Sequence, residues 1–168
     1  MCRSSLRPIA RNAPRSSGTV DSEEKVSAWN LKKGDRILRK KLHDRFGGGR
    51  QGGISPSRKT PNIMIFSDHV VGREHGYADR KQGDFFLYVG EGQQGDQTMT
   101  HGNKAILNHV EDGRAIRLFN GCKGEVSYAG EFEIDLIEPF FTERAPSSGG
   151  GRERSVLVFR LREVRSQE

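Results

Sequence analysis

The segment Gly76–Gln97, with the sequence GYADRKQGDFFLYVGEGQQGDQ, contains the residues on which the interpretation of this chain depends. Inside it, the run Phe85–Val89 is apolar throughout and is followed by a glycine, which is typical of a buried strand. Tyr77 and Tyr88 lie on either side of a turn. We therefore expect the strands that carry these two tyrosines to run side by side around one cavity.

Strand patterns recur along the rest of the chain. The segment Glu131–Ile137 alternates strictly, with Phe132, Ile134 and Leu136 on one face, as in a half-buried strand. The segment Lys33–Leu38 fits an early strand or the end of a helix. Together the patterns predict a β-rich α+β fold, a twisted and partly closed β-barrel with helices packed outside. The other expected strands are Asn62–Phe66, Ala115–Phe119 and Ser155–Arg162, and the expected helix is Asn103–Glu111.

Length and charge limit the number of domains and the kind of partner. The chain has 168 residues, 33% of them hydrophobic, which is enough for one domain with a modest core. Residues 1–25 are rich in Arg, Ser and Pro and are predicted to form a disordered basic tail, so the domain spans 26–168. Residues 1–58 carry fourteen Lys and Arg against five Asp and Glu. This excess of positive charge indicates a polyanion partner such as nucleic acid, although a solvated basic face explains it equally well.

No pattern of catalytic or metal-ligating residues is found in the sequence. The five histidines form no HExxH motif and have no zinc spacing with Cys2 or Cys122, and no phosphate-binding glycine loop opens a helix. We therefore expect no metal, no cofactor and no catalytic activity in this chain. Two cysteines cannot form a disulfide framework, and no apolar stretch is long enough to span a membrane, so a cytoplasmic location is expected.

Several motifs, in their order and spacing, resemble the SRA (SET and RING-associated, or YDG) family of modified-cytosine readers. The similarity extends from Gly76 to Val164. It is greatest to the SRA-like domains found beside HNH nuclease domains in McrA-type modification-dependent restriction enzymes, where a glycine-rich segment, here Gly48–Ile54, precedes the motif. The matching residues are Gly76, Tyr77, Asp79, Gly83, Phe85, Phe86, Tyr88, Gly90, Asp96, Gln97, Asn103, Gly113–Arg117 and Tyr128–Gly130.

The resemblance implies that the chain flips a modified cytosine out of the duplex and holds it in a pocket. Tyr77 and Tyr88 would enclose the base between two rings, and the carboxylate of Asp79 would accept a hydrogen bond from the cytosine amino group. In the alternative interpretation no base is bound: the two tyrosines fill the mouth of the barrel, and Asp79 forms a turn. The implied pocket residues are Gly76, Tyr77, Asp79, Tyr88, Val89, Gly90 and Glu91.

The sequence departs from the family pattern at several positions, and the turn between the two tyrosines is about one residue shorter than in the eukaryotic members. Ala129 stands where the family has the Asp of its YDG signature, and Glu91 stands where a small residue often contacts the methyl group, which leaves the preferred 5-substituent open. The loop that carries a base-replacing finger in eukaryotic relatives is nearly absent between Gly92 and Asp96, so we predict no preference for hemimethylated sites. The loop Gly47–Gly53 is the candidate to fill the gap that the flipped base leaves in the DNA base stack. The expected DNA contacts are Arg50, Gln51, Gly52, Gly53, Lys104 and Arg117.

The resemblance therefore favours a module that binds double-stranded DNA and reads 5-modified cytosine, with 5-methylcytosine as the first candidate. Such a module would be the specificity part of a modification-dependent restriction system, and an HNH nuclease would be its partner. Two alternatives stay open. One is an RNA-binding domain of the related PUA-like barrel type, and the other is part of a nuclease with its own cleavage activity.

Overall fold

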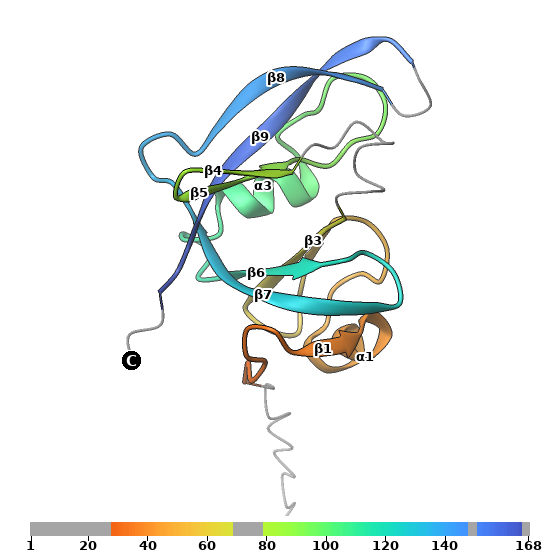
Figure 1. The fold of residues 1–168 in the computed structure, drawn as a ribbon, viewed down its shortest axis with the longest axis vertical. Helices are drawn as coiled ribbons and strands as arrows, with labels where there is room; N and C mark the ends of the chain where they lie inside the picture. Colours follow the sequence, from red (N-terminus) through yellow and green to blue (C-terminus); the bar gives the residue numbers. More distant parts are fainter. Residues whose placement is uncertain (1–27, 69–78, 148–150, 166–168) are drawn as a thin grey trace, which may run out of the picture.

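The computed structural model describes residues 28–68, 79–147 and 151–165. Within these ranges the chain forms one nine-stranded sheet and two helices (Figure 1). The expected tail, residues 1–25, and two expected pocket residues, Gly76 and Tyr77, lie outside the described ranges. The strands are β1 (Arg36–Leu38), β2 (Ile54–Pro56), β3 (Asn62–Ser67), β4 (Arg80–Gln82), β5 (Phe85–Val89), β6 (Ala115–Asn120), β7 (Glu125–Ile134), β8 (Phe140–Pro146) and β9 (Glu153–Glu163), and the helices are α1 (Arg39–Phe46) and α3 (His101–Leu107).

The main path of the sheet runs β2-β3-β6-β7-β9-β5-β4, while β1 pairs with β7 and β8 with β9. The β3 and β6 strands are parallel, and the other pairs are antiparallel. The β-rich α+β class is confirmed. The sheet is not closed, however, because its end strands β2 and β4 have three residues each and do not pair with each other, so the expected barrel describes it only loosely.

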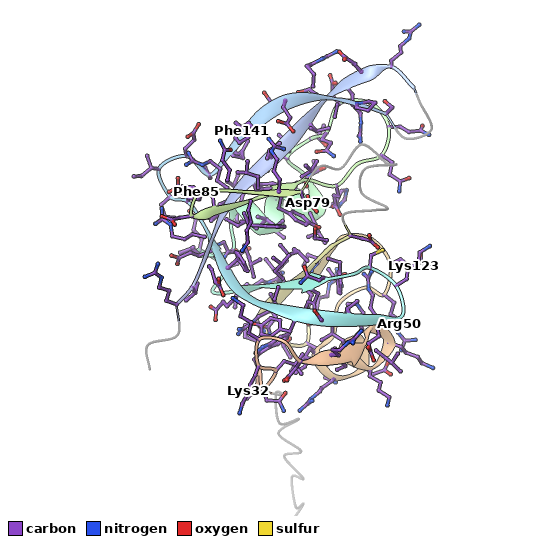
Figure 2. The ribbon with its side chains drawn as sticks, in the orientation of Figure 1. Lys32, Arg50, Asp79, Phe85, Lys123 and Phe141 are labelled. Carbon is purple, nitrogen blue, oxygen red and sulfur yellow. The ribbon has the colours of Figure 1, made fainter. Side chains whose placement is uncertain are left out.

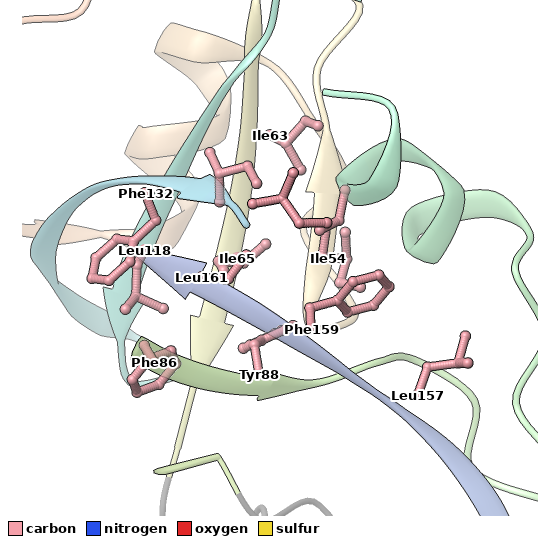
Figure 3. Close-up of a cluster of buried hydrophobic side chains, with 13 residues drawn as sticks. Ile54, Ile63, Ile65, Phe86, Tyr88, Leu118, Phe132, Leu157, Phe159 and Leu161 are labelled. Carbon is pink, nitrogen blue, oxygen red and sulfur yellow. The ribbon is translucent and has the colours of Figure 1, made fainter. Parts of the chain in front are cut away.

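The largest core cluster lies between the strands around β3 and β6 and the strands β5 and β9, with α3 beside it (Figure 3). Strand β9 contributes Leu157, Phe159 and Leu161 to this cluster, while Val156 and Val158 on its opposite face pack with Leu87 of β5 in a separate cluster. Strand β9 is therefore buried on both faces, and Phe141 and Ala145 of β8, which pairs with β9 edge to edge, pack against the second set of side chains. The sequence patterns did not predict β8.

The strand expected over Glu131–Ile137 is wrong at its end. It is the last part of the longer β7, which stops at Ile134, and Leu136 is 78% exposed instead of facing the core. The backbone N–H of Ile137 donates a hydrogen bond to the Asp135 carboxylate, a local turn bond that bends the chain out of the sheet. Alternation alone could not reveal this turn, because the residues after Ile134 continue the same pattern.

Helix α1 packs a second apolar cluster against the opposite face of β3, β6 and β7. Its buried face consists of Arg39, Leu42, His43 and Phe46, which have the i, i+3, i+4, i+7 spacing of a helix. Two of these four residues are polar, so the apolar period that signals a helix is hidden in the sequence. Of the two alternatives for Lys33–Leu38, the structure shows the early strand, β1, and the end of a helix is wrong, because α1 begins only after it.

Helix α3 overlaps the helix expected over Asn103–Glu111, but it begins at His101 and ends at Leu107. Among the described residues, no helix has the length and the apolar character needed to cross a membrane.

Candidate nucleic-acid interface

The carboxylate of Asp79 lies where the ends of β3 and β5 meet. The Ser67 hydroxyl, at the end of β3, donates a hydrogen bond of 2.7 Å to Oδ2. The backbone N–H of Val89, at the end of β5, donates one of 2.8 Å to Oδ1. Both oxygens are therefore oriented by the sheet, and an ionised carboxylate can accept up to about four hydrogen bonds. In Figure 2 Asp79 lies near the middle of the molecule.

Tyr88 is part of the main core cluster and is 3% exposed (Figure 3). Its hydroxyl lies 2.9 Å from the carbonyl oxygen of Gly53 and 3.1 Å from that of Phe66, so it ties β5 to β3 and to the loop before β2. Its pairing with Tyr77 around a base stays a prediction, because Tyr77 lies outside the described residues. Two cavities of about 390 Å³ that described residues line lie elsewhere on β5, near Phe85.

The loop 90–97 after β5 is held by two side-chain amides of the expected motif. The Asn103 amide bonds to both backbone groups of Glu91, because its Oδ1 accepts from the N–H at 2.8 Å and its Nδ2 donates to the carbonyl at 3.0 Å. The Gln97 amide donates to the carbonyl of Gly90 at 2.6 Å and accepts from the N–H of Leu157 at 2.9 Å. The Asp-Gln and Asn positions of the motif therefore fix the loop to α3 and β9.

Glu91 and Gly90 are close to helix α3. The carboxylate of Glu91 accepts a hydrogen bond of 2.7 Å from the backbone N–H of Gly102, a contact that no sequence pattern predicted. A Cβ atom at Gly90 would lie 2.6 Å from Oδ1 of Asn103, so a larger residue would displace the amide that holds the loop.

The glycine-rich loop 47–53 is held through its carbonyl groups, and its exposed side chains point outward. Arg50 and Gln51 are exposed, and Arg50 forms an ion pair with Asp44 of α1. Because its backbone is bound at several points, the loop presents these side chains from a fixed position. The carbonyls and their donors are Gly47 with His43 Nδ1 at 2.8 Å, Gly49 with Ser55 Oγ at 2.7 Å, Gly52 with Arg39 Nη2 at 2.7 Å, and Gly53 with Phe66 N–H at 2.9 Å and the Tyr88 hydroxyl.

Arg39 joins this loop to the turn between β6 and β7. Arg39 is 7% exposed, and its guanidinium lies 3.7 Å from the centre of the Phe66 ring. It donates 2.7 Å hydrogen bonds to the carbonyls of Gly52 and Cys122. Burial lowers the pKa of Arg39 from its ordinary value. In the sequence Arg39 is only one member of the basic cluster. Its i, i+4 spacing to His43, which places both residues on one face of α1, was the signal that could have identified it.

The His43 imidazole is neutral in this arrangement. Its Nε2 accepts a hydrogen bond from Arg39 at 3.2 Å, so the proton resides on Nδ1, which faces the Gly47 carbonyl. Burial is the main cause that lowers the pKa of His43 from its ordinary value of 6.5, and the charges of Arg39 and Arg50 lower it further.

We expect acid to weaken the fold through His43. Because the pKa is lower in the folded state than in the unfolded state, the unfolded chain binds a proton first as the pH falls through about 6.5, and the free energy of unfolding decreases. Urea unfolding at pH 7.5 and at pH 5.5 measures this decrease. A His43→Gln variant keeps a donor for Gly47 without titrating and should show a smaller decrease; an equal decrease in both proteins would contradict the role of His43.

The two other expected DNA contacts differ in exposure. Lys104 is exposed on α3. Arg117 is turned into the protein: its side chain is 14% exposed, it pairs with Glu131 at 3.1 Å and its guanidinium lies 4.6 Å from the centre of the Trp29 ring. This geometry gives Arg117 a packing role, and its contact with DNA stays a prediction.

The segment that matches the YDG signature lies on β7, at a bulge in the pairing with β6. Leu118 pairs with Gly130 and Phe119 with Tyr128, so Ala129 is the extra residue between them. The hydroxyl of Tyr128 accepts a 3.1 Å hydrogen bond from Arg117, and burial raises the pKa of this phenol. The signature therefore has a structural role here, and the bulge forms without the missing Asp.

The open, mostly antiparallel sheet, the carboxylate between the ends of β3 and β5 and the amide-anchored loop after β5 define an SRA domain. Residues 33–168 match the family model described as the ScoMcrA-like SRA domain. The chain belongs to this ScoMcrA-like family.

Solved structures with the same fold include those of ScoMcrA and of the SUVH5 SRA domain. The sulfur-binding and SRA domains of ScoMcrA, complexed with phosphorothioated DNA, superpose with a TM-score of 0.63 at 24% identity over 82% of this chain and 41% of that one. The type IV phosphorothioation-dependent restriction endonuclease ScoMcrA gives 0.62 at 25% identity, with 82% of this chain and 25% of that chain covered. The SRA domain of SUVH5 with hemimethylated CG DNA gives 0.59 at 25% identity, with coverages of 83% and 93%.

The chain thus spans less than half of the two ScoMcrA chains and nearly the whole SUVH5 domain. No curated protein matches the sequence.

Proposed function

We propose that this chain is a DNA-binding module that recognises a 5-modified cytosine, 5-methylcytosine in the first instance, after the nucleotide is flipped out of the duplex. The observation that carries the proposal is Asp79, whose carboxylate is oriented by donors at the ends of β3 and β5. A carboxylate accepts a hydrogen bond from the cytosine amino group, whereas thymine presents a carbonyl oxygen at that position. Membership of the SRA family and the DNA-bound structures of relatives support the same class of ligand.

In this proposal Tyr88 forms one wall of the base pocket and Tyr77 the other. Stacking of the flipped base between the two tyrosine rings contributes roughly 1–3 kcal/mol of binding free energy and offsets the cost of flipping. Because the Tyr88 side chain is buried here, its ring must be uncovered before a base can stack on it. The hydroxyl is bound to Gly53, so base entry is coupled to a change in the loop 47–53.

We propose that the loop 47–53 enters the DNA duplex at the position that the flipped base has left. Arg50 and Gln51 are its exposed tip, and the loop is linked through Gly53 and Phe66 to the same strand end that holds Asp79. Exposed cations, namely Lys104 of α3 and Lys40, Lys41 and Arg45 of α1, would neutralise phosphates on either side. The module would supply specificity to a restriction system whose HNH nuclease is a separate domain or partner.

The test is a binding comparison by fluorescence anisotropy at about 150 mM salt, since affinity for DNA depends on the salt concentration. The protein is titrated with two duplexes that differ only in one 5-methylcytosine. We expect about tenfold tighter binding of the methylated duplex, which corresponds to roughly 1.4 kcal/mol. Equal affinities would overturn the proposal.

The same experiment includes the competing functions as outcomes. Preferential binding of a structured RNA over the methylated duplex would favour the RNA-binding alternative. Metal-dependent cleavage of methylated DNA by the purified chain would make it a nuclease. A phosphorothioated duplex, the kind of DNA with which the ScoMcrA domains are complexed, tests whether a backbone modification is read instead.

A further inference from the structure

The side chain of Arg154, near the start of β9, is a buried cation with an unused pair of donors. It is 2% exposed, and its Nη1 donates hydrogen bonds to the carbonyls of Gly92 and Gly95 in the loop 90–97. Its Nε and Nη2 atoms are buried and have no hydrogen-bond partner. Buried donors in proteins are almost always satisfied, so this pair needs an explanation.

The two unused atoms are the edge of the guanidinium that binds oxyanions. Nε and Nη2 point the same way and together form the fork that pairs with a carboxylate or a phosphate through two parallel hydrogen bonds. Among the described residues, Arg154 forms no ion pair with a carboxylate. A buried charge without a counter-charge is unfavourable, and an arriving oxyanion would remove this penalty.

The loop that covers Arg154 is the same loop that adjoins the proposed base site. It starts directly after β5 (Figure 1). At its end it is anchored to β9, where Asp96 and Gln97 bond to the backbone of Ser155. Between these anchors the residues Gly92–Asp96 are exposed to solvent. Gly92 and Gly95 have φ values of +124° and +65°, a backbone conformation that glycine adopts without strain. The Gly92 carbonyl also accepts a 3.1 Å hydrogen bond from the Gln97 amide, so the part of the loop that would have to shift to uncover Arg154 is 93–95.

We propose that Arg154 is a binding residue for a phosphate of the DNA backbone, reached when the middle of the loop 90–97 shifts away from the guanidinium. This inference rests on the proposed function, because DNA is the ligand that brings the phosphate to this end of the sheet. The fork of Nε and Nη2, which contacts neither glycine carbonyl, would form two charge-assisted hydrogen bonds to phosphate oxygens. The contact recognises the backbone, so it contributes affinity without distinguishing one base from another.

An Arg154→Met variant tests this inference. We expect it to bind the methylated and the unmethylated duplex about tenfold more weakly, as for loss of a charged hydrogen bond. The slope of log K against log salt should become shallower by about 0.9, the value for one phosphate. The preference for the methylated duplex should be unchanged, and the unfolding midpoint of the free protein should not fall, because an unpaired buried charge has been removed.

Arg162→Met is the matched control, since Arg162 lies on the same strand, at the opposite end, and is exposed. It removes the same charge and should leave the salt slope within error of the unaltered protein. If Arg154→Met instead lowers the unfolding midpoint and leaves the salt slope unchanged, Arg154 only caps the two glycine carbonyls and the inference is overturned.

The two proposals can fail separately in this experiment. If the unaltered protein shows no preference for 5-methylcytosine but Arg154→Met still changes the salt slope, the phosphate site stands and base reading fails. If the preference is present and the Arg154 variant keeps the original slope, base reading stands and the phosphate site fails.

Discussion

An Asp79→Ala variant should bind methylated and unmethylated duplexes with equal affinity, so the expected tenfold preference falls to about one. Methylated and unmethylated cytosine present the same amino group to this carboxylate, so without the acceptor the pocket no longer holds the flipped base and the 5-methyl group is not read. Weak binding that depends strongly on salt should remain, because phosphate contacts lie outside the base pocket. Anisotropy titrations with the two duplexes measure the ratio directly.

The substitution also affects the fold, and this effect must be separated from recognition. Without Asp79, the N–H of Val89 and the hydroxyl of Ser67 lose their acceptor, and we expect the free energy of unfolding to fall by about 1–3 kcal/mol. The ratio of two affinities measured on one folded sample is insensitive to this loss. Titrations are therefore run at a temperature at which the variant remains folded by circular dichroism.

Asp84→Ala is the control for charge. Asp84 is exposed in the turn between β4 and β5, so its removal changes the net charge equally without touching the ends of β3 and β5. This variant should keep the preference for the methylated duplex. If Asp79→Ala also keeps it, Asp79 only ties two strand ends together and cytosine must be read by other groups.

The sequence identified the motif residues of the candidate site but not what they contact. Asp79, Gln97 and Asn103 stand in motifs that can be found by spacing alone. Their partners are set by tertiary structure: the Asn103 amide bonds to the backbone of Glu91, and the Gln97 amide reaches Leu157 on β9. A linear motif contains no information about which distant backbone groups an amide will satisfy.

Strands and helices could be predicted where a regular spacing of apolar residues marks the buried face. They could not be predicted where polar side chains occupy buried positions. Strands β3, β5, β6 and β9 are apolar runs and lie close to their expected positions. Strand β8 was missed because none of its residues is fully buried and one of its half-buried positions holds a charged residue, Glu143. Helix α1 was missed because Arg39 and His43 occupy buried positions that a pattern search assigns to apolar residues.

The second large effect should follow from replacing Arg39, and it concerns stability more than recognition. An Arg39→Met variant keeps an apolar side chain of similar length but removes every donor. The carbonyls of Gly52 and Cys122 then lose their bonds, and the contact with the Phe66 ring loses its charge. We expect the free energy of unfolding to fall by about 2–4 kcal/mol, measured by urea denaturation at neutral pH.

Two further variants distinguish the geometry of Arg39 from its charge. Lys40→Met removes one positive charge from the exposed side of the same helix and should change the free energy of unfolding by less than about 0.5 kcal/mol. Arg39→Lys keeps the charge, but one ammonium group cannot reproduce the planar fork that reaches two carbonyls, so most of the loss should persist. Because the Gly52 carbonyl loses its bond to the guanidinium in both Arg39 variants, the loop 47–53 is held less firmly, and DNA binding should weaken for methylated and unmethylated duplexes together. Full stability in Arg39→Lys would mean that the charge over the Phe66 ring, and not the bonds to the two carbonyls, holds this part of the molecule together.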